Sequence, residues 1–360
     1  MHPVLEALER CDPSNPLINF PPPCLPDLLE YADLVAAVTL AAYNRVVSGD
    51  GTSLPVVATD APLAELAGTA WAGAVTADAA GVAGEEALRA ALETAHPSNG
   101  MSGKNTGGGW AVSGRRWLVD AVDRPETLAA GQPFWSAIIT VQSQSFEHHD
   151  GELAESTDAV VITAPAMGRL WFAVRGFGAY SCSVNGDAPV AQRISAGQSM
   201  DVAMGIAELD VDSLMLPVLQ ASPRIPGRLG IGWSQMLVAE GLMPLAIASN
   251  VDQVHDVLGL RLLLEESGGR LSTIQNLRGD GGVFVLSSNE RIHDHTLVAI
   301  GPQPLAESRT FLARHFAAEG EAVAAQGMLR GFAQPAYRDR ITLPALVVVP
   351  PIASQPEHQR

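Results

Sequence analysis

Apolar and polar positions recur with two different periods along this chain, and the period predicts which segments are helices. Residues 27–47 carry apolar side chains at three- to four-residue spacing behind Asp27, an N-cap residue type, so a helix is predicted there. A second helix is predicted from about Ala79 to Thr94. Residues 97–109 are rich in glycine and polar residues, which predicts a loop.

Strand patterns follow these helices. Residues 134–146 and 158–165 are predicted to be neighbouring antiparallel strands, and 169–186 read as strand, glycine turn and strand. Helix and strand then alternate. The expected elements are a helix over 232–241, a strand over 244–249, a helix over 254–269 ending in Gly-Gly, and a strand over 282–289.

The two ends of the chain differ from this central region. Consecutive prolines in residues 1–26 predict an extended arm or a cap, because proline disfavours helix interiors. A helix near 304–328 and an apolar run at 341–350 form a C-terminal extension. Four segments result: a Pro-rich arm (1–26), an α+β half (27–165), an α/β half (166–300) and the extension (301–360).

Composition restricts the classes of function. The chain has 39 acidic and 22 basic residues, a net charge of −17, which argues against a general nucleic-acid or anionic-membrane binder. A small phosphorylated ligand, which needs only a local cation or metal, remains compatible with this charge. Three cysteines form no CxxC pair and the N-terminus has no apolar run typical of a signal peptide, so a cytoplasmic protein is expected.

Four short motifs occur in one order along the chain. They are VTAD (75–78), WLVDAVDRP (117–125), GFGAYSCSVNG (176–186) and HDVLGLRLLLEESGG (255–269). Together they resemble the inositol monophosphatase family of metal-dependent phosphatases over about residues 30–300. The central run matches the aromatic residue and both aspartates of the family's W-x-x-D-P-x-D-G-T motif.

The resemblance implies an α/β fold, a layered α/β/α/β/α sandwich with an α+β half and an α/β half. It implies Mg²⁺ ligands at the carboxylates of Asp120, Asp123 and Asp256 and at the carbonyl of Val122, with Asp78 near the attacking water. Carboxylate oxygens suit Mg²⁺, which neutralises phosphate oxygens during phosphoryl transfer. It also implies a homodimer as one assembly state.

The chain departs from the family pattern at the catalytic positions. A metal-binding glutamate of the family aligns with Lys104, and the Gly-Thr of its D-G-T motif aligns with Arg124 and Pro125. These changes make the cluster more positive, which weakens the case for several Mg²⁺ ions. Lys104 could instead lie in the vacated metal position and pair with Asp120 or Asp123.

Substrate-binding candidates lie in the second half. The run GRLGIGWS (227–234) resembles a helix start at which Arg228 and the Gly232 amide could hold an anion. Ser249 aligns with the family's inositol-contacting glutamate, which argues mildly against inositol phosphate as substrate. His255 stands beside Asp256, and such a pair can serve acid/base chemistry. Adjacent helix residues point apart, however, which argues against this role for His255.

Three functions are therefore compatible with the sequence. The first is phosphate-ester hydrolysis on a small phosphorylated or anionic metabolite with a reduced Mg²⁺ site. The second is a non-phosphatase enzyme of the same fold in which Lys104 and Arg124 replace metal charge. The third is a non-catalytic binding homologue.

Overall fold

The computed structural model describes nine stretches of the chain. They are residues 2–19, 21–48, 77–146, 153–184, 189–196, 206–209, 231–249, 254–275 and 282–288. The helices are α1 (Pro3–Cys11), α2 (Pro16–Asn19), α3 (Leu25–Ser48), α5 (Ala77–Ala95), α6 (Pro125–Ala129), α8 (Ile231–Ala239) and α9 (Val254–Glu266), with a 3-10 turn at Pro165–Met167.

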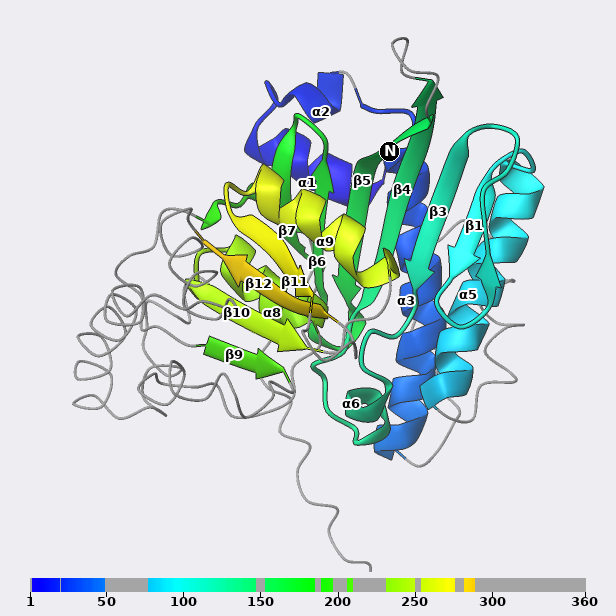
Figure 1. Ribbon diagram of the computed structural model, residues 1–360, viewed down its shortest axis with the longest axis vertical. Coiled ribbons are helices and arrows are strands. Elements are labelled where there is room, and N and C mark those ends of the chain that lie inside the picture. The colour runs from blue at the N-terminus through cyan, green and yellow to red at the C-terminus, as the bar shows by residue number, and fades with distance from the viewer. Residues whose placement is uncertain are drawn as a thin grey trace, which may run out of the picture.

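An eight-stranded sheet in the order β2-β1-β3-β4-β5-β6-β7-β8 forms the centre (Figure 1). Strand β1 runs parallel to β3, whereas the other pairings recorded among the described strands of this sheet are antiparallel. The strands are β1 (Gly100–Gly103), β2 (Gly107–Gly108), β3 (Arg115–Asp120), β4 (Ala137–Phe146), β5 (Leu153–Ala164), β6 (Arg169–Val174), β7 (Gly178–Ser183) and β8 (Val190–Arg193).

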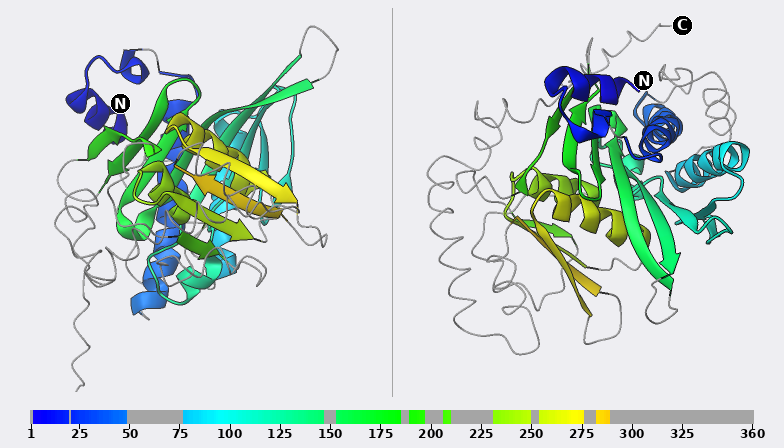
Figure 2. Two further views of the ribbon diagram at one scale, coloured as in Figure 1. Left: turned by 60° about the vertical axis from the view of Figure 1, so that its left-hand side comes forward. Right: turned by 90° about the horizontal axis from the view of Figure 1, so that it is seen from above.

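A second sheet has four strands in the order β11-β12-β10-β9. Helices α8 and α9 lie between the two sheets, while α3 and α5 cover the opposite face of the large sheet (Figures 1 and 2). The described elements therefore form successive helix, sheet, helix and sheet layers. The four strands are β9 (Ile206–Leu209), β10 (Leu245–Ser249), β11 (Arg270–Gln275) and β12 (Gly282–Ser287).

Both faces of the large sheet are buried, and side chains alternate between two separate cores. Ile139 and Val161 pack in the core under α3, whereas their neighbours Ile138 and Ile162 pack in the core under α8 and α9. Successive strand residues point to opposite faces, so a strand buried on both sides shows few polar positions. The apolar runs of the sequence have this origin.

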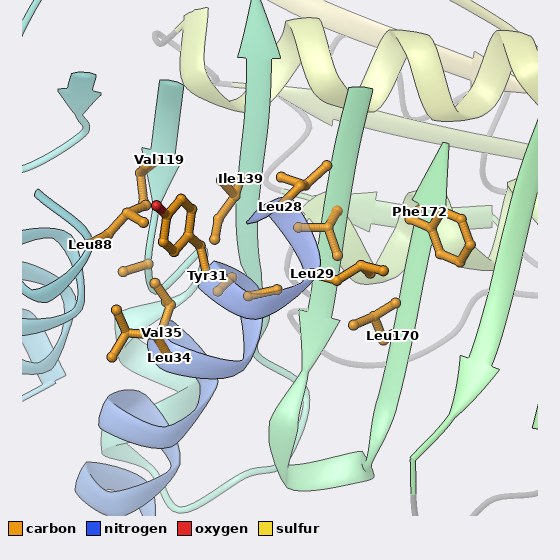
Figure 3. Close-up of a cluster of buried hydrophobic side chains, with 14 of the residues drawn as sticks. Leu28, Leu29, Tyr31, Leu34, Val35, Leu88, Val119, Ile139, Leu170 and Phe172 are labelled. Carbon is orange, nitrogen blue, oxygen red and sulfur yellow. The ribbon is translucent and has the colours of Figure 1, made fainter. Parts of the chain in front are cut away.

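Helix α3 fills the first of these cores (Figure 3). Leu28 and Leu29 lie toward the strands, and the Tyr31 ring packs edge-on against Trp117 with centroids 5.2 Å apart. Such aromatic pairs add stabilisation beyond the area that they bury. The apolar spacing of residues 27–47 thus reflects a helix face held on a sheet.

Most elements predicted from periodicity are confirmed. The two long helices appear as α3 and α5, the antiparallel pair as β4 and β5, and the second half alternates as α8, β10, α9 and β12. Helix α9 ends just before Gly268, which has a φ of +93° that favours glycine.

Two expectations are wrong. The arm over 1–26 is not extended but contains α1 and α2, and α1 packs against β8. Pro3 and Pro16 begin these helices, where a missing N–H costs nothing. The loop predicted over 97–109 contains β1 and β2, because β1 pairs with β3 as an edge of the sheet.

The predicted helix near 304–328 and the apolar run at 341–350 lie outside the described residues, as does the whole segment 301–360. None of the described helices is long and apolar enough to cross a membrane.

A buried ion pair joins the large sheet to the end of α8. Arg169 Nη2 and Trp171 Nε1, both on β6, donate to Glu240 Oε1 at 2.5 and 2.7 Å, and the two charged side chains are 6% and 9% exposed. Removing one partner of such a pair leaves the other charge buried without compensation.

We therefore expect Glu240→Ala to lower the free energy of unfolding by about 3 kcal/mol. Glu265→Ala, at an exposed position on α9, is the matched control and should change it by less than about 0.5 kcal/mol. Urea denaturation followed by tryptophan fluorescence measures both. Equal effects of the two substitutions would contradict this prediction.

Candidate functional site

Strand β3 delivers the first acidic residue of the site. Its residues alternate, so Trp117 and Val119 enter the core under α3 while Asp120, the last residue, faces the layer of α8 and α9. The Asp120 side chain is 0% exposed. A carboxylate so enclosed needs hydrogen-bond donors or a cation, since burying an unpaired charge is costly.

Lys104 supplies that cation from the turn between β1 and β2. Its backbone N–H donates to Val119 O at 2.8 Å, and its Nζ donates to Asp120 Oδ2 at 2.6 Å. The other carboxylate oxygen, Oδ1, accepts the Val122 N–H at 3.2 Å. Both oxygens of Asp120 are therefore engaged, one of them by an ammonium group.

Asp123 lies three residues further along the chain, between β3 and α6, and contacts the first turn of α8. Its Oδ2 accepts the Gly232 N–H at 2.9 Å and the Ser136 hydroxyl at 3.2 Å. Burial raises the pKa of Asp123, and the nearby charge of Asp120 raises it further, while Lys104, the Gly232 hydrogen bond and Arg124 act in the opposite direction. The Gly232 amide, predicted to bind a substrate anion, thus meets a carboxylate of the protein itself.

His255, in the first turn of α9, reaches across to β1. Its Nε2 lies 3.0 Å from Ser102 Oγ, and burial lowers the pKa of the imidazole although the Asp120 charge opposes this. Nδ1 is buried and makes no hydrogen bond with any residue that the structure describes. His255 therefore lies close enough to Asp120 and Lys104 for their charges to act on it.

The remaining predicted residues are distributed more widely. Val122 is buried beside Asp120, and Arg124 is half-buried just before α6, where its charge acts on Asp123. Asp78 is exposed in the first turn of α5. Arg228 and the side chains of Ser249 and Asp256 lie outside the described part of the chain, so their roles stay predictions.

Sequence reasoning missed Ser102 and Ser136, which contact His255 and Asp123 from distant segments. It also missed Glu85, which binds the turn that follows Lys104. One simple signal was also overlooked: Lys104 is the only lysine in the chain, since the other basic residues are arginines. A single lysine among arginines draws attention to its position, because a compact ammonium and a planar guanidinium are not interchangeable.

The described groups around Asp120 engage oxygens that a divalent ion would need. Mg²⁺ requires about six oxygen ligands in near-octahedral geometry, whereas one Asp120 oxygen carries the Lys104 ammonium and one Asp123 oxygen accepts two hydrogen bonds. Within the described residues, no three or more His, Cys, Asp or Glu side chains are grouped to hold a metal. Lys104 instead brings a single fixed positive charge to Asp120.

Comparison with known proteins finds similar sequences and similar structures. No protein-family model matches the chain. It is 30% identical to the histidinol-phosphatase of Mycobacterium tuberculosis over 224 residues, which are 60% of this chain and 81% of that protein. The extragenic suppressor protein SuhB of Bartonella henselae superposes with a TM-score of 0.53 at 18% identity, covering 81% of this chain and 98% of that one. Mycobacterium tuberculosis SuhB superposes with a TM-score of 0.51 at 18% identity, covering 75% of this chain and 93% of that one.

The ion pair between Lys104 and Asp120 can be tested by its effect on stability. Lys104→Met should lower the free energy of unfolding by about 2 kcal/mol, less than for a fully enclosed pair because Lys104 is 23% exposed. The double variant Lys104→Met/Asp120→Asn, which removes the unpaired charge as well, should recover most of that loss. Equal stabilities of the single and double variants in urea titrations would contradict the pairing.

Proposed function

Because the chain belongs to the inositol monophosphatase family, we propose that it acts on a small phosphorylated metabolite and hydrolyses its phosphate ester, with the Lys104 ammonium standing in place of a metal ion. The single observation that carries the proposal is the 2.6 Å contact of Lys104 Nζ with the buried Asp120 carboxylate. It supports a cation that is built into the chain at the carboxylate cluster.

The charges of the site favour a phosphate group. Lys104 and Arg124 offset Asp120 and Asp123, so a dianion approaching from solvent does not meet a net negative cluster. Charge-assisted hydrogen bonds from an ammonium or guanidinium to phosphate oxygens are short and strong. These two cations are the groups proposed to hold the phosphate and to stabilise charge on its oxygens as the ester bond breaks.

The other predicted residues keep, as proposals, the roles that the family resemblance implies. Asp78, exposed at the start of α5, is proposed to lie near the attacking water, and Arg228 and Ser249 to contact the substrate. Monovalent side-chain cations stabilise a phosphoryl transition state less than divalent ions do. We therefore expect slow turnover.

A second candidate function is favoured by one observation. The Ser102 hydroxyl and the His255 imidazole lie 3.0 Å apart, and a hydroxyl beside an imidazole is suited to proton transfer in chemistry other than phosphate hydrolysis. This arrangement favours a repurposed enzyme of the same fold. If the wild-type protein binds phosphate but hydrolyses no phosphate ester, the result would favour a repurposed enzyme or a purely binding role.

The proposal is tested by binding and turnover measured on the same variants. Isothermal titration with inorganic phosphate and with Mg²⁺ is run on wild type, Lys104→Met, Lys104→Glu and the exposed control Arg270→Met. Hydrolysis of histidinol phosphate, inositol monophosphate and p-nitrophenyl phosphate is followed with and without Mg²⁺. Histidinol phosphate is the substrate that the name of a relative indicates, and inositol monophosphate is the one that the family name indicates.

We expect Lys104→Met to weaken phosphate binding and to lower kcat/KM by about tenfold or more, with no change in Arg270→Met. Lys104→Glu should gain affinity for Mg²⁺, because a carboxylate then replaces the ammonium. Tight Mg²⁺ binding by wild type together with unchanged activity of Lys104→Met would overturn the proposal.

A further inference from the structure

Glu85, on helix α5, is a carboxylate that is 0% exposed and yet plays no part in the site as described so far. It accepts four groups of the turn that follows Lys104. Asn105 N and Thr106 N donate at 3.0 and 2.8 Å, and Asn105 Nδ2 and Thr106 Oγ1 donate at 2.8 and 2.9 Å. Burial raises the pKa of the Glu85 carboxyl above its usual value, and the hydrogen bonds from Asn105 and Thr106 offset part of this rise.

The turn is shaped around this carboxylate. A Cβ at Gly103 would collide with Glu85 Oε2 and Thr106 Oγ1, so only glycine fits there. One helical turn beyond Glu85, Arg89 Nη2 donates to Thr106 Oγ1 at 2.8 Å and to Gly107 O at 2.9 Å. Two side chains of α5, four residues apart, therefore hold the turn from one side.

The opposite side of the turn is held by the sheet. The Lys104 N–H donates to Val119 O on β3, and β1 pairs with β3 from Gly100 to Gly103. The Lys104 backbone is thus fixed between β3 and α5. Its side chain extends to the Oδ2 atom of Asp120, which is the last residue of β3. The place of the ammonium depends on both supports.

We propose that Glu85 is the positioning residue of the site: by binding the N–H groups of Asn105 and Thr106, it fixes the turn so that the Lys104 ammonium lies on Asp120. Its relevance to phosphate rests on the function proposed above. Glu85 does not touch the substrate and acts through Lys104. A residue that only stabilised α5 would affect unfolding but not the place of the ammonium.

The test combines a spectroscopic probe with a double-mutant cycle. Since Lys104 is the only lysine, protein grown with ¹⁵N-lysine gives one ammonium signal. Glu85→Gln places an amide NH₂ against N–H donors and should displace the turn. Glu86→Gln is the matched control, with the same change of charge at the next, exposed residue of α5.

We expect Glu85→Gln to shift or broaden the Lys104 ammonium signal and to weaken inorganic phosphate binding about tenfold, with neither effect in Glu86→Gln. In the Lys104→Met background, Glu85→Gln should weaken phosphate binding no further, because the group through which it acts is gone.

Each other outcome overturns a distinct statement. An unchanged ammonium signal in Glu85→Gln, or an equal loss of phosphate affinity with and without Lys104, refutes the positioning role. A shifted signal with phosphate affinity insensitive to Lys104→Met retains the positioning role and refutes the proposed function. If Glu85→Gln does not fold, Thr106→Val removes one donor to Glu85 from the turn side and is read by the same two measurements.

Discussion

The large sheet is covered by helices on both faces, so side chains on both sides of its central strands are buried. An apolar residue is accommodated on either side, so a polar one on a central strand must find a partner. Asp120 is such a residue: its strand places it toward α8 and α9 with no exposure to water. The ammonium of Lys104 and the amide of Val122 compensate the buried carboxylate.

The same constraint explains why the site is assembled from segments that are remote in sequence. Asp123 follows β3 but is satisfied by Ser136 and by the first turn of α8. His255 comes from α9 and meets Ser102 on β1. The space between the layers is where strand ends and helix starts converge, and there a few polar groups satisfy one another amid apolar packing.

Much of the fold was predictable because its signals are local. The spacing of apolar residues in α3 and α5 and the runs of β4, β5 and β6 identify these elements without tertiary information. The consecutive prolines at 21–23 led to a non-helical prediction for all of residues 1–26. The isolated prolines at positions 3 and 16 were overlooked, although a proline favours a helix start. Strand β1 was missed because its identity depends on pairing with β3 rather than on its glycine-rich composition.

The site divides in the same way. Asp120, Asp123 and Lys104 could be named from motif order, and the partners of Asp123 could not, because hydrogen bonds across tens of residues leave no pattern in the sequence. Glu85 is the clearest example: within α5 it resembles its exposed neighbour Glu86, and only the turn at Asn105 and Thr106 distinguishes the two.

A cation carried on a side chain has no dissociation constant. A metal ion at Asp120 would exchange with solvent and would depend on the supply and the chelators of its surroundings, whereas the Lys104 ammonium is made with the chain and remains attached to it. Its local concentration is set by the length of a four-carbon stem. The positive charge at Asp120 is therefore present from the moment of folding.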